Sequence, residues 1–572
     1  MKCAAPRPGG VGQAARRRAT IEAMNRPKPL RSLLALIGLL LWLVTPAWPA
    51  DGHAAAGEAV YRLGVLPSGA MLRGEREAGV RVEALGAACV TCHRPSGLGT
   101  TEGRIVVPPI IGKYLFRPHS TNVRDMSLPH VVGYRSTREP YTDASLARAI
   151  REGVGPNGRT LNYLMPRYAL DDATMASLVE YLKGLSSDAV PGVSDSTLHF
   201  ATIITPDADP VQRKGMLDVM ERFFADKNAF IRGGVRPMQA TREIEYRVSR
   251  RWQLHVWELT GAPDQWERQL RAHLAAEPVY AVISGLGRRN WEPVHRFCQA
   301  EALPCLLPNV DLPVTAEGEF YPVYFSRGVL LEADLVAGRV SEQREAAGLQ
   351  RVVQVFREGD VGQSAAAAFA KAVGATGLRV ESHVLEAASP SSRAGDELAG
   401  AMKDLGPDDV LLLWLRGEDL ARLPADMPRV SMAFVSGALG GLEHAPLPAA
   451  WHAAVHMTYP ADLPELRKIR MNFPLGWFKI KQIDVVAEKV QTDTYVALGI
   501  LAETLTDMLD SFVRDYLVER VEVMLSHRQV NGYYPRLSLA PGQRFASKGG
   551  YIVRFAGPQG AAVVADGEWI VP

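Results

Sequence analysis

The sequence predicts a multidomain protein in which a small all-α domain precedes a larger, two-lobed α/β domain. Short helical patterns surround the segment CVTCH at residues 89–93. Residues 186–197 are small and polar, with Pro191-Gly192 in the middle and no apolar period, which is typical of a linker. Beyond them, apolar runs of strand length alternate with helical stretches, as in parallel sheets that are covered on both faces.

The composition is that of a globular protein with large cores, because 47% of its 572 residues are hydrophobic and 22% are charged. At ordinary domain sizes the chain has room for about three or four compact units. The 64 basic residues nearly balance the 62 acidic ones, for a net charge of +2. This balance gives no indication of a nucleic-acid partner or of an anionic membrane surface.

The first 50 residues have the pattern of a secretory signal. Leu33 to Val44 is an apolar run, preceded by Lys28 and Arg31 and followed by small residues. Met24 would give a more ordinary signal start than Met1. The run is too short for a comfortable membrane span, although an uncleaved N-terminal anchor is the competing interpretation. We expect an exported, periplasmic protein with no permanent membrane span.

The most specific motif is Cys89-Val90-Thr91-Cys92-His93, the spacing that attaches a c-type haem. Two cysteines on one tight turn can anchor the two vinyl groups, and the adjacent imidazole then lies under the iron. A thioredoxin-like redox pair requires no following histidine, and half of a zinc site requires a second ligand pair that the sequence lacks. We therefore expect one covalently attached haem, with His93 as an iron ligand.

The remaining cysteines of the predicted mature chain are Cys298 and Cys305, where a helix is expected to turn into a strand. An oxidising compartment would allow them to form a disulfide. Two unpaired buried thiols are the alternative.

Residues 57–185 resemble the class I c-type cytochromes, and we expect the domain to cover residues 51–185. The resemblance rests on the haem motif, on expected helices at 77–88, 146–153 and 171–184, and on the pair Met165-Pro166 shortly before the last helix. It implies that Met165 is the sixth iron ligand. It also implies that the carbonyl of Pro108 or Pro109 accepts a hydrogen bond from His93.

The sequence leaves open other choices for the sixth iron ligand and the role of the basic residues that follow the motif. Met71, Met126 and Met175 are rival methionines, and His119 and His130 could in principle complete a bis-histidine haem. A basic segment follows the motif, and either it contacts haem propionates or an acidic partner, or it is a solvated loop face. Its residues are Arg94, Arg104, Lys113, Arg117 and Arg124.

The α/β part contains ten apolar runs with helical segments between most of them, which predicts two open, largely parallel sheets. In such sheets ligands bind outside the carboxyl ends of the strands. The expected strands are 198–204, 254–259, 279–284, 305–307, 321–325, 352–356, 380–385, 410–415, 429–435 and 453–459. Residues 485–525 are strongly helical, and we expect two helices there that pack on the sheets.

This succession, together with the closing segment from Tyr534 to Tyr551, resembles the type I periplasmic substrate-binding proteins of the branched-chain amino-acid group of ABC importers. The resemblance covers residues 197–572, and we expect the domain at 198–572. It implies two lobes joined by three crossings, with a small ligand held between them.

The loop after the strand at 279–284 departs from that family, because it contains Ser284, then glycines, then Arg288 and Arg289. Backbone N–H groups and two arginines would suit an anionic ligand rather than an amino acid. A glycine-rich turn with solvated arginines is the alternative. Further candidates for contact with a ligand lie at other strand ends, namely Glu358, Asp360, Arg416 and Ser436.

The patterns favour an exported mono-haem cytochrome that transfers electrons in the periplasm to or from a partner protein. The attached module would sense a ligand or dock a partner. The second hypothesis is a solute-binding protein of the ABC type with an accessory or regulatory haem. The third is a haem enzyme such as a peroxidase, which would need a vacant distal position. No catalytic triad or paired-carboxylate site emerges, so we expect an electron carrier rather than a substrate-transforming enzyme.

Overall fold

The structure is a computed structural model of the full chain. It describes residues 50–102, 104–117, 139–233, 250–316, 318–387, 391–508, 511–527, 532–557, 560 and 562–572. The expected signal segment lies outside these residues, as do Met126, His119 and His130. Residues 53–572 form one compact unit.

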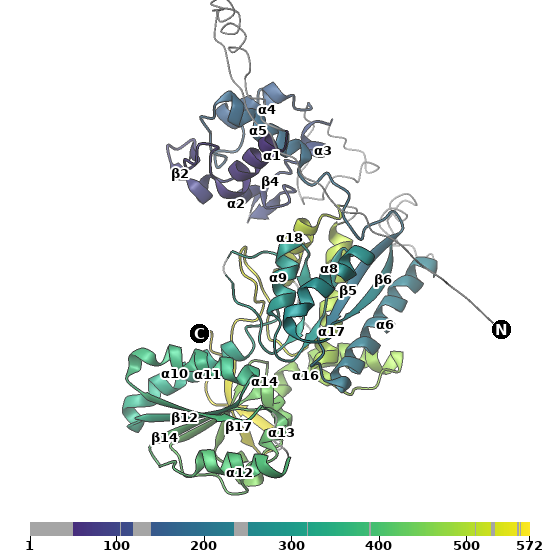
Figure 1. The fold of residues 1–572 in the computed structure, drawn as a ribbon. Helices are drawn as coiled ribbons and strands as arrows, with labels where there is room; N and C mark the ends of the chain where they lie inside the picture. Colours follow the sequence, from purple (N-terminus) through teal and green to yellow (C-terminus); the bar gives the residue numbers. More distant parts are fainter. Residues whose placement is uncertain are drawn as a thin grey trace, which may run out of the picture. The chain divides into compact units, whose positions relative to one another are not determined.

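The N-terminal domain, residues 50–184, is mainly helical and carries two small antiparallel sheets, β1-β2 and β3-β4 (Figure 1). The sequence predicted an all-α domain, and the two small sheets depart from that prediction. Its elements are α1 (Ala50–Glu58), η1 (Ala59–Leu63), β1 (Arg73–Glu75), β2 (Arg81–Glu83), η2 (Ala84–Ala87), α2 (Val90–His93), β3 (Thr100–Glu102), β4 (Ile105–Val107), α3 (Gly112–Leu115), α4 (Asp143–Glu152) and α5 (Asp172–Gly184).

Two of the three helices expected in this domain are present. In α5, the Asp171 side chain accepts a hydrogen bond from the Thr174 N–H and so caps the first turn. In α4, the chain ends the helix at Gly153, whose φ of 71° is the left-handed conformation that glycine adopts without strain.

The helix expected at residues 77–88 is wrong. A turn at Gly79, with φ of 75°, joins β1 to β2, and only the last residues before the motif coil into the short 3-10 helix η2. Val80 and Leu85 are more than half exposed, so the apolar residues that suggested a helix do not form a buried stripe.

The first lobe is built on a parallel sheet with the strand order β10-β8-β5-β7-β9-β11, and β6 pairs with β5. Its elements are β5 (Thr197–Ile204), α6 (Pro210–Gly233), β6 (Arg251–Glu258), η3 (Pro263–Gln265), α8 (Trp266–Ala276), β7 (Ala281–Ile283), β8 (Leu286–Gly287), α9 (Glu292–Ala300), β9 (Cys305–Leu306), β10 (Asn309–Val310) and β11 (Pro322–Val323).

The second lobe has the strand order β13-β12-β14-β15-β16-β17-β18, parallel as far as β16 and antiparallel after it. Its elements are α10 (Val329–Ala347), β12 (Arg351–Arg357), α11 (Val361–Ala372), η4 (Gly374–Thr376), β13 (Arg379–Leu385), α12 (Ser391–Met402), β14 (Asp409–Trp414), α13 (Gly417–Leu420), β15 (Met432–Ser436), α14 (Gly437–Gly440), η5 (Leu442–His444), α15 (Ala449–His452), β16 (Val455–Tyr459), β17 (Tyr551–Ala556) and β18 (Ala562–Ala565).

Strand β14 shows why apolar runs without alternation mark these sheets. Val410 and Leu412 pack in the core beneath α10 and α11, whereas Leu411 and Leu413 pack in the core that contains residues of α12. Because side chains alternate across a strand, a strand that is covered on both faces must be apolar at every position. Figure 1 shows α10 and α11 on one face of this sheet and α12 on the other.

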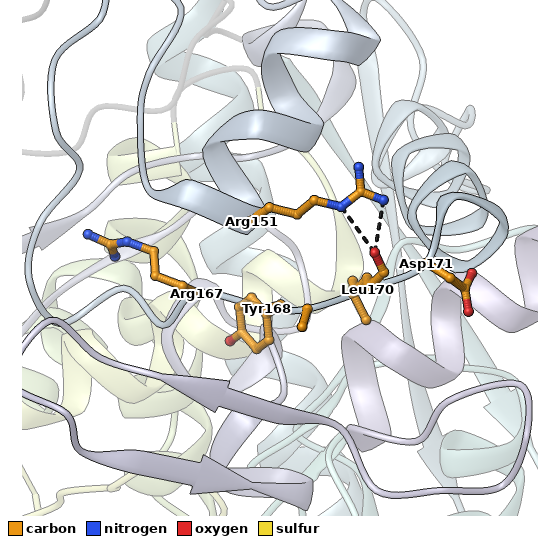
Figure 2. Close-up of a pocket in the computed structure, with 6 residues that line it drawn as sticks. Arg151, Arg167, Tyr168, Leu170 and Asp171 are labelled. Carbon is orange, nitrogen blue, oxygen red and sulfur yellow. Dashed lines mark hydrogen bonds between the residues drawn. The ribbon is translucent and has the colours of Figure 1, made fainter.

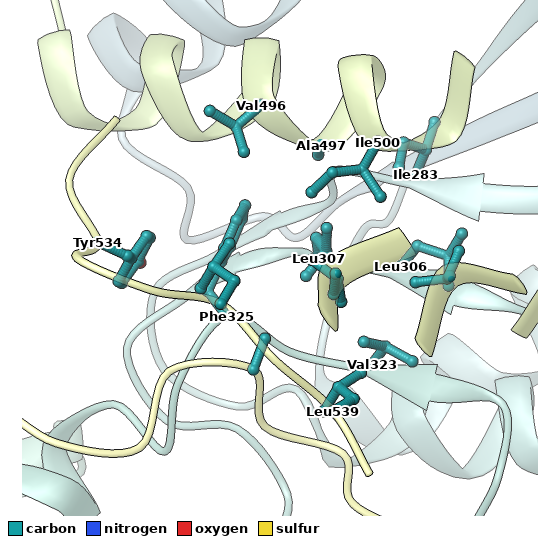
Figure 3. Packing of buried hydrophobic residues seen from close by; sticks show 14 of the residues in the cluster. Ile283, Leu306, Leu307, Val323, Phe325, Val496, Ala497, Ile500, Tyr534 and Leu539 are labelled. Atoms are coloured by element: carbon teal, nitrogen blue, oxygen red, sulfur yellow. The ribbon is translucent and has the colours of Figure 1, made fainter. Parts of the chain in front are cut away.

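The chain passes between the two lobes three times: before α10, after β16 and before β17. After β16 it forms α16 (Pro464–Lys481) and then α17 (Glu488–Met508) and α18 (Arg514–His527), the two helices expected at 485–525. On helix α17, the side chains of Val496, Ala497 and Ile500 pack against the first sheet. Ile283 and Leu306 of that sheet face them (Figure 3). Within the described residues, no helix has both the length and the apolar character needed to cross a bilayer.

Phe369 tests the core of the second lobe, because this side chain of α11 has no exposed surface. We expect Phe369→Ala to destabilise the lobe by about 3–5 kcal/mol, since both transfer free energy and packing are lost. Urea unfolding followed by circular dichroism measures the change. Val384→Ala, at a position that is 56% exposed, is the control and should leave the transition in place.

Candidate functional site

The CVTCH segment folds as a single tight turn. The His93 N–H donates to the Cys89 carbonyl at 2.8 Å, and residues 90–93 form the one-turn helix α2. Cys89 and Cys92 are not joined in a disulfide. Burial raises the pKa of the Cys89 thiol to about 12. The turn therefore keeps two thiols outside any disulfide, together with the imidazole, within one stretch of five residues.

The His93 side chain is buried, and its Nδ1 lies 2.9 Å from the carbonyl oxygen of Pro108. Of the two prolines named by the resemblance, Pro108 is the partner. Since a carbonyl only accepts hydrogen bonds, Nδ1 carries the proton and Nε2 keeps its lone pair for a metal. Burial lowers the pKa of His93 to about 4, although the hydrogen bond to Pro108 acts in the opposite direction. The ring is thus held neutral, as a metal ligand must be.

Gly99 fixes the position of that carbonyl. Its φ is 79°, and a Cβ atom here would lie 2.2 Å from the Val107 oxygen and 3.1 Å from the Pro108 oxygen. Gly99 precedes β3, which pairs with β4, and β4 ends at Val107. The hairpin and its glycine therefore bring residue 108 to the imidazole.

Met165 lies in a turn closed by its own N–H, which donates to the Asn162 carbonyl at 2.9 Å, and it packs partly buried against the core. Two residues later, Arg167 exchanges backbone hydrogen bonds of 3.0 and 2.8 Å with Glu75 of β1. The Tyr168 hydroxyl donates to the Ala87 carbonyl at 2.7 Å, two residues before Cys89. The methionine turn is thus tied to the chain that leads into the haem motif.

The rival methionines in the described residues have other surroundings. Met71 is 50% exposed, and Met175 is buried in the core on α5. Neither lies in a partly buried turn that is tied to the haem motif, as Met165 does.

Arg76 offers a feature that the sequence did not predict. Its Nε is buried and has no hydrogen-bond partner in the described residues. Its charge acts on Tyr168, the same tyrosine that contacts Ala87. A buried guanidinium N–H needs an acceptor, and a propionate carboxylate is such a group. The cysteines, the neutral imidazole, the thioether and this unpaired donor together fit a covalently attached haem.

A cavity of about 500 Å³ opens beside the Met165 turn, and Figure 2 shows its lining. The Arg151 guanidinium donates to the Leu170 carbonyl at 3.0 and 2.8 Å, and the Arg167 side chain donates to the Glu152 carbonyl. The two arginine side chains that line the cavity thus already donate hydrogen bonds to carbonyl groups of the same domain. The lining residues are Arg151, Arg167, Tyr168, Ala169, Leu170 and Asp171.

In the basic segment after the motif, Arg104, Lys113 and Arg117 are exposed, as expected of a solvated face, and Arg124 lies outside the described residues, but Arg94 differs. The Arg94 side chain is only 12% exposed and forms an ion pair with Glu522 of α18. Ser96 is fully buried, and Glu519 of α18 accepts hydrogen bonds from its N–H at 2.8 Å and from its hydroxyl at 2.7 Å. Residues 89–96, which we call the haem turn, therefore contact a helix that lies more than 400 residues later in the sequence.

Three of the seven residues predicted to contact a ligand come together between the lobes. Arg416 donates to both oxygens of Asp360 at 2.7 and 2.9 Å and to the Arg288 carbonyl at 2.9 Å. Two acids of this cluster carry no recognisable signal in the sequence: Asp311, 2.8 Å from Arg416, and Glu418, 2.7 Å from Arg288. Burial alone would raise the pKa of Asp360, but the hydrogen bonds and charge of Arg416 bring it below its usual value.

The other four candidates lie elsewhere. The buried Ser284 hydroxyl bonds to Thr494 of α17 at 2.9 Å and to Asn309 at 3.1 Å. The Ser436 hydroxyl donates to Glu332 at 2.5 Å. Arg289 and Glu358 are exposed. The seven candidates therefore do not form one set, and the two arginines that meet between the lobes are paired with acids.

Cys298 of α9 and Cys305 of β9 form a disulfide, with their Cα atoms 6.1 Å apart. Of the two interpretations that the sequence left open, the structure shows the bridge. It joins the end of a helix to the strand that follows it, as the intervening turn allows.

One comparison with known proteins covers the haem site. Residues 80–186 match the family model described as cytochrome c. A search of curated proteins found no match. Among solved structures, the chain is similar to a fatty acid ABC transporter substrate-binding protein from Thermomonospora curvata, with 15% identity, 67% of this chain and 95% of that chain covered, and a TM-score of 0.48. It is also similar to the leucine-binding protein LivK from Thermotoga maritima, with 12% identity, 66% and 99% covered, and a TM-score of 0.45.

Residues 80–186 are a cytochrome c domain, and such a domain implies covalently attached haem c. The chain as a whole joins this domain to a two-lobed α/β domain.

Gly99→Ala tests the link between the β3-β4 hairpin and the imidazole. The methyl group would collide with the Val107 carbonyl and shift Pro108, so we expect less haem incorporation and a lower melting temperature. Gly79→Ala is the matched control, because Gly79 has a similar φ of 75° but nothing within 4 Å of its Cβ position. Pyridine haemochrome assays measure the haem. Equal losses in both variants would mean that backbone strain, and not the collision, is responsible.

Glu332 predicts a pH dependence in the second lobe. Burial raises its pKa to about 7, although Ser436, Ala438 and Thr458 donate hydrogen bonds to it. A raised acid pKa in the folded state means that stability is fully present below about pH 4.5 and is lost as the pH rises toward 7. We expect Glu332→Gln to abolish this decline in urea unfolding between pH 4.5 and 7. Glu345→Gln, at an exposed position of the same helix, should retain it.

Proposed function

We propose that the protein is an exported electron carrier in which one covalently attached haem takes an electron from a periplasmic partner and passes it to another. The two-lobed module binds a small ligand or docks a partner. The buried, neutral His93, held by the Pro108 carbonyl, supports this proposal most strongly. A fixed imidazole and a fixed thioether suit an iron that changes charge without changing its ligands.

In this proposal Cys89 and Cys92 would hold the haem through thioether bonds, and His93 Nε2 and Met165 Sδ would bind its iron. Arg76 would receive a propionate carboxylate at its buried Nε. Iron in such a site supplies one-electron oxidation and reduction. The Pro108 carbonyl keeps the imidazole in one tautomer, and the tie between Tyr168 and Ala87 keeps the methionine turn beside the haem motif.

The second candidate function is a solute receptor of the ABC type with an accessory haem. The paired cluster of Arg288, Asp311, Asp360, Arg416 and Glu418 favours a neutral or zwitterionic solute over an anion, because an anion must displace carboxylates that already bind the arginines. In either case the haem domain supplies the redox chemistry and the lobes supply recognition.

The test is the mass and spectrum of the protein produced in a periplasm that carries out haem attachment. We expect a mass increase of one haem and a low-spin spectrum with the far-red band of methionine-ligated ferric haem. Met165→Ala should lose that band and become high-spin, whereas Met71→Ala, at an exposed position, should keep it. Cys89→Ala and Cys92→Ala should each lose one thioether bond.

Two results would contradict the proposal. A high-spin wild-type spectrum would favour the peroxidase-like hypothesis, since it would show an open iron position. A mature chain without the haem mass would remove the electron-carrier function altogether.

A further inference from the structure

Helix α18 of the first lobe presents an acidic face to the N-terminal domain. Asp515, Glu519 and Glu522 follow one another at spacings of four and three residues, which places them on one side of a helix. All three are buried. Buried carboxylates require partners, and residues of the N-terminal domain and of the first lobe supply them.

On the N-terminal side, each acid has its own partner. Asp515 pairs with Arg62 at 3.1 Å, Glu519 accepts both hydrogen bonds of Ser96, and Glu522 pairs with Arg94. Arg94 and Ser96 follow His93 by one and three residues. The Tyr61 hydroxyl donates to the Arg94 carbonyl at 2.7 Å and holds the same loop from within its own domain.

On the lobe side, two of the three acids have a further partner. The Tyr321 hydroxyl donates to Asp515 at 2.5 Å, and Arg544 pairs with Glu522. Arg544 also donates to the Phe320 carbonyl at 2.6 Å. The Glu522 carboxylate thus bridges Arg94, next to the haem motif, and the body of the first lobe.

We infer that the acidic face of α18 is a permanent docking surface for the haem turn, so that the N-terminal domain and the first lobe act as one body and Glu519 and Glu522 are positioning residues of that turn. This inference rests on the proposed function only in that the turn carries the haem. The Glu519 side chain is buried, and this burial raises its pKa to about 8, against the effect of Arg94 and Ser96.

The first test cuts the covalent connection. A protease site inserted between Asp188 and Ala189, two exposed residues, allows the purified full-length protein to be nicked between the two parts. We expect the two fragments to co-elute in size-exclusion chromatography, at low and at moderate salt, because buried pairs are screened little. Separation of the wild-type fragments would overturn the inference.

The second test removes the acids from the nicked protein. We expect Glu519→Ala and Glu522→Ala each to weaken the association of the fragments by at least about tenfold, since Ser96 then loses its hydrogen-bond acceptor and Arg94 its ion partner. Glu180→Ala, at an acid of the N-terminal domain with a 65% exposed side chain, is the control and should change nothing. Unchanged association in both α18 variants would contradict their role.

The third test reads the haem itself. In the uncut protein, Glu522→Gln should raise the midpoint potential, because the charges of Arg94 and Arg544 are then unbalanced beside the turn and disfavour the oxidised iron. Glu180→Gln should leave the potential unchanged. Haem content measured on the same samples separates the two failures: absence of haem overturns the proposed function, whereas a full haem load with an unshifted potential overturns only the positioning role.

Discussion

The hydrogen bond from His93 to the Pro108 carbonyl is the constraint on which the haem site depends. It fixes the tautomer of a buried ring, and with it the one nitrogen that is left for iron. The supports of that bond are backbone features: the β3-β4 hairpin, the left-handed Gly99 and the turn that begins at Cys89. Because they involve few side chains, the geometry of the imidazole is set by the course of the chain rather than by packing.

The α/β module satisfies its own charges between the lobes, and this limits what it can recognise. Arg416 is bonded to two acids and a carbonyl, and Arg288 to a third acid. A buried ion pair contributes little net stability, but the removal of one partner is costly. If the proposed ligand binds here, it must offer groups that replace those it displaces, which disfavours a simple anion.

The sequence predicted those elements and sites whose residues lie close together in the chain. The haem motif, the capped helix before Gly184, the helices α17 and α18, and the apolar strands of both sheets follow from residues that are close together in the chain. The expected helix at 77–88 was wrong because the left-handed turn at Gly79 overrides the helical spacing of its apolar residues. Signals that depend on distant partners could not be found in this way. Arg94 looked like a solvated charge because Glu522 lies 428 positions further along the chain, and Ser436 looked like a ligand contact because nothing nearby in sequence indicates that Glu332 takes its hydroxyl.

The disulfide between Cys298 and Cys305 has a consequence for the order of maturation. Thioether formation consumes two thiols and requires them reduced, whereas the α9-β9 bridge requires an oxidant. One polypeptide thus makes opposite chemical demands on the compartment in which it matures. The bridging cysteines are seven positions apart and can find each other early, but an equally prompt oxidation of Cys89 with Cys92 would leave the porphyrin nothing to react with. Haem attachment therefore requires that Cys89 and Cys92 stay reduced while Cys298 and Cys305 in the same chain become oxidised.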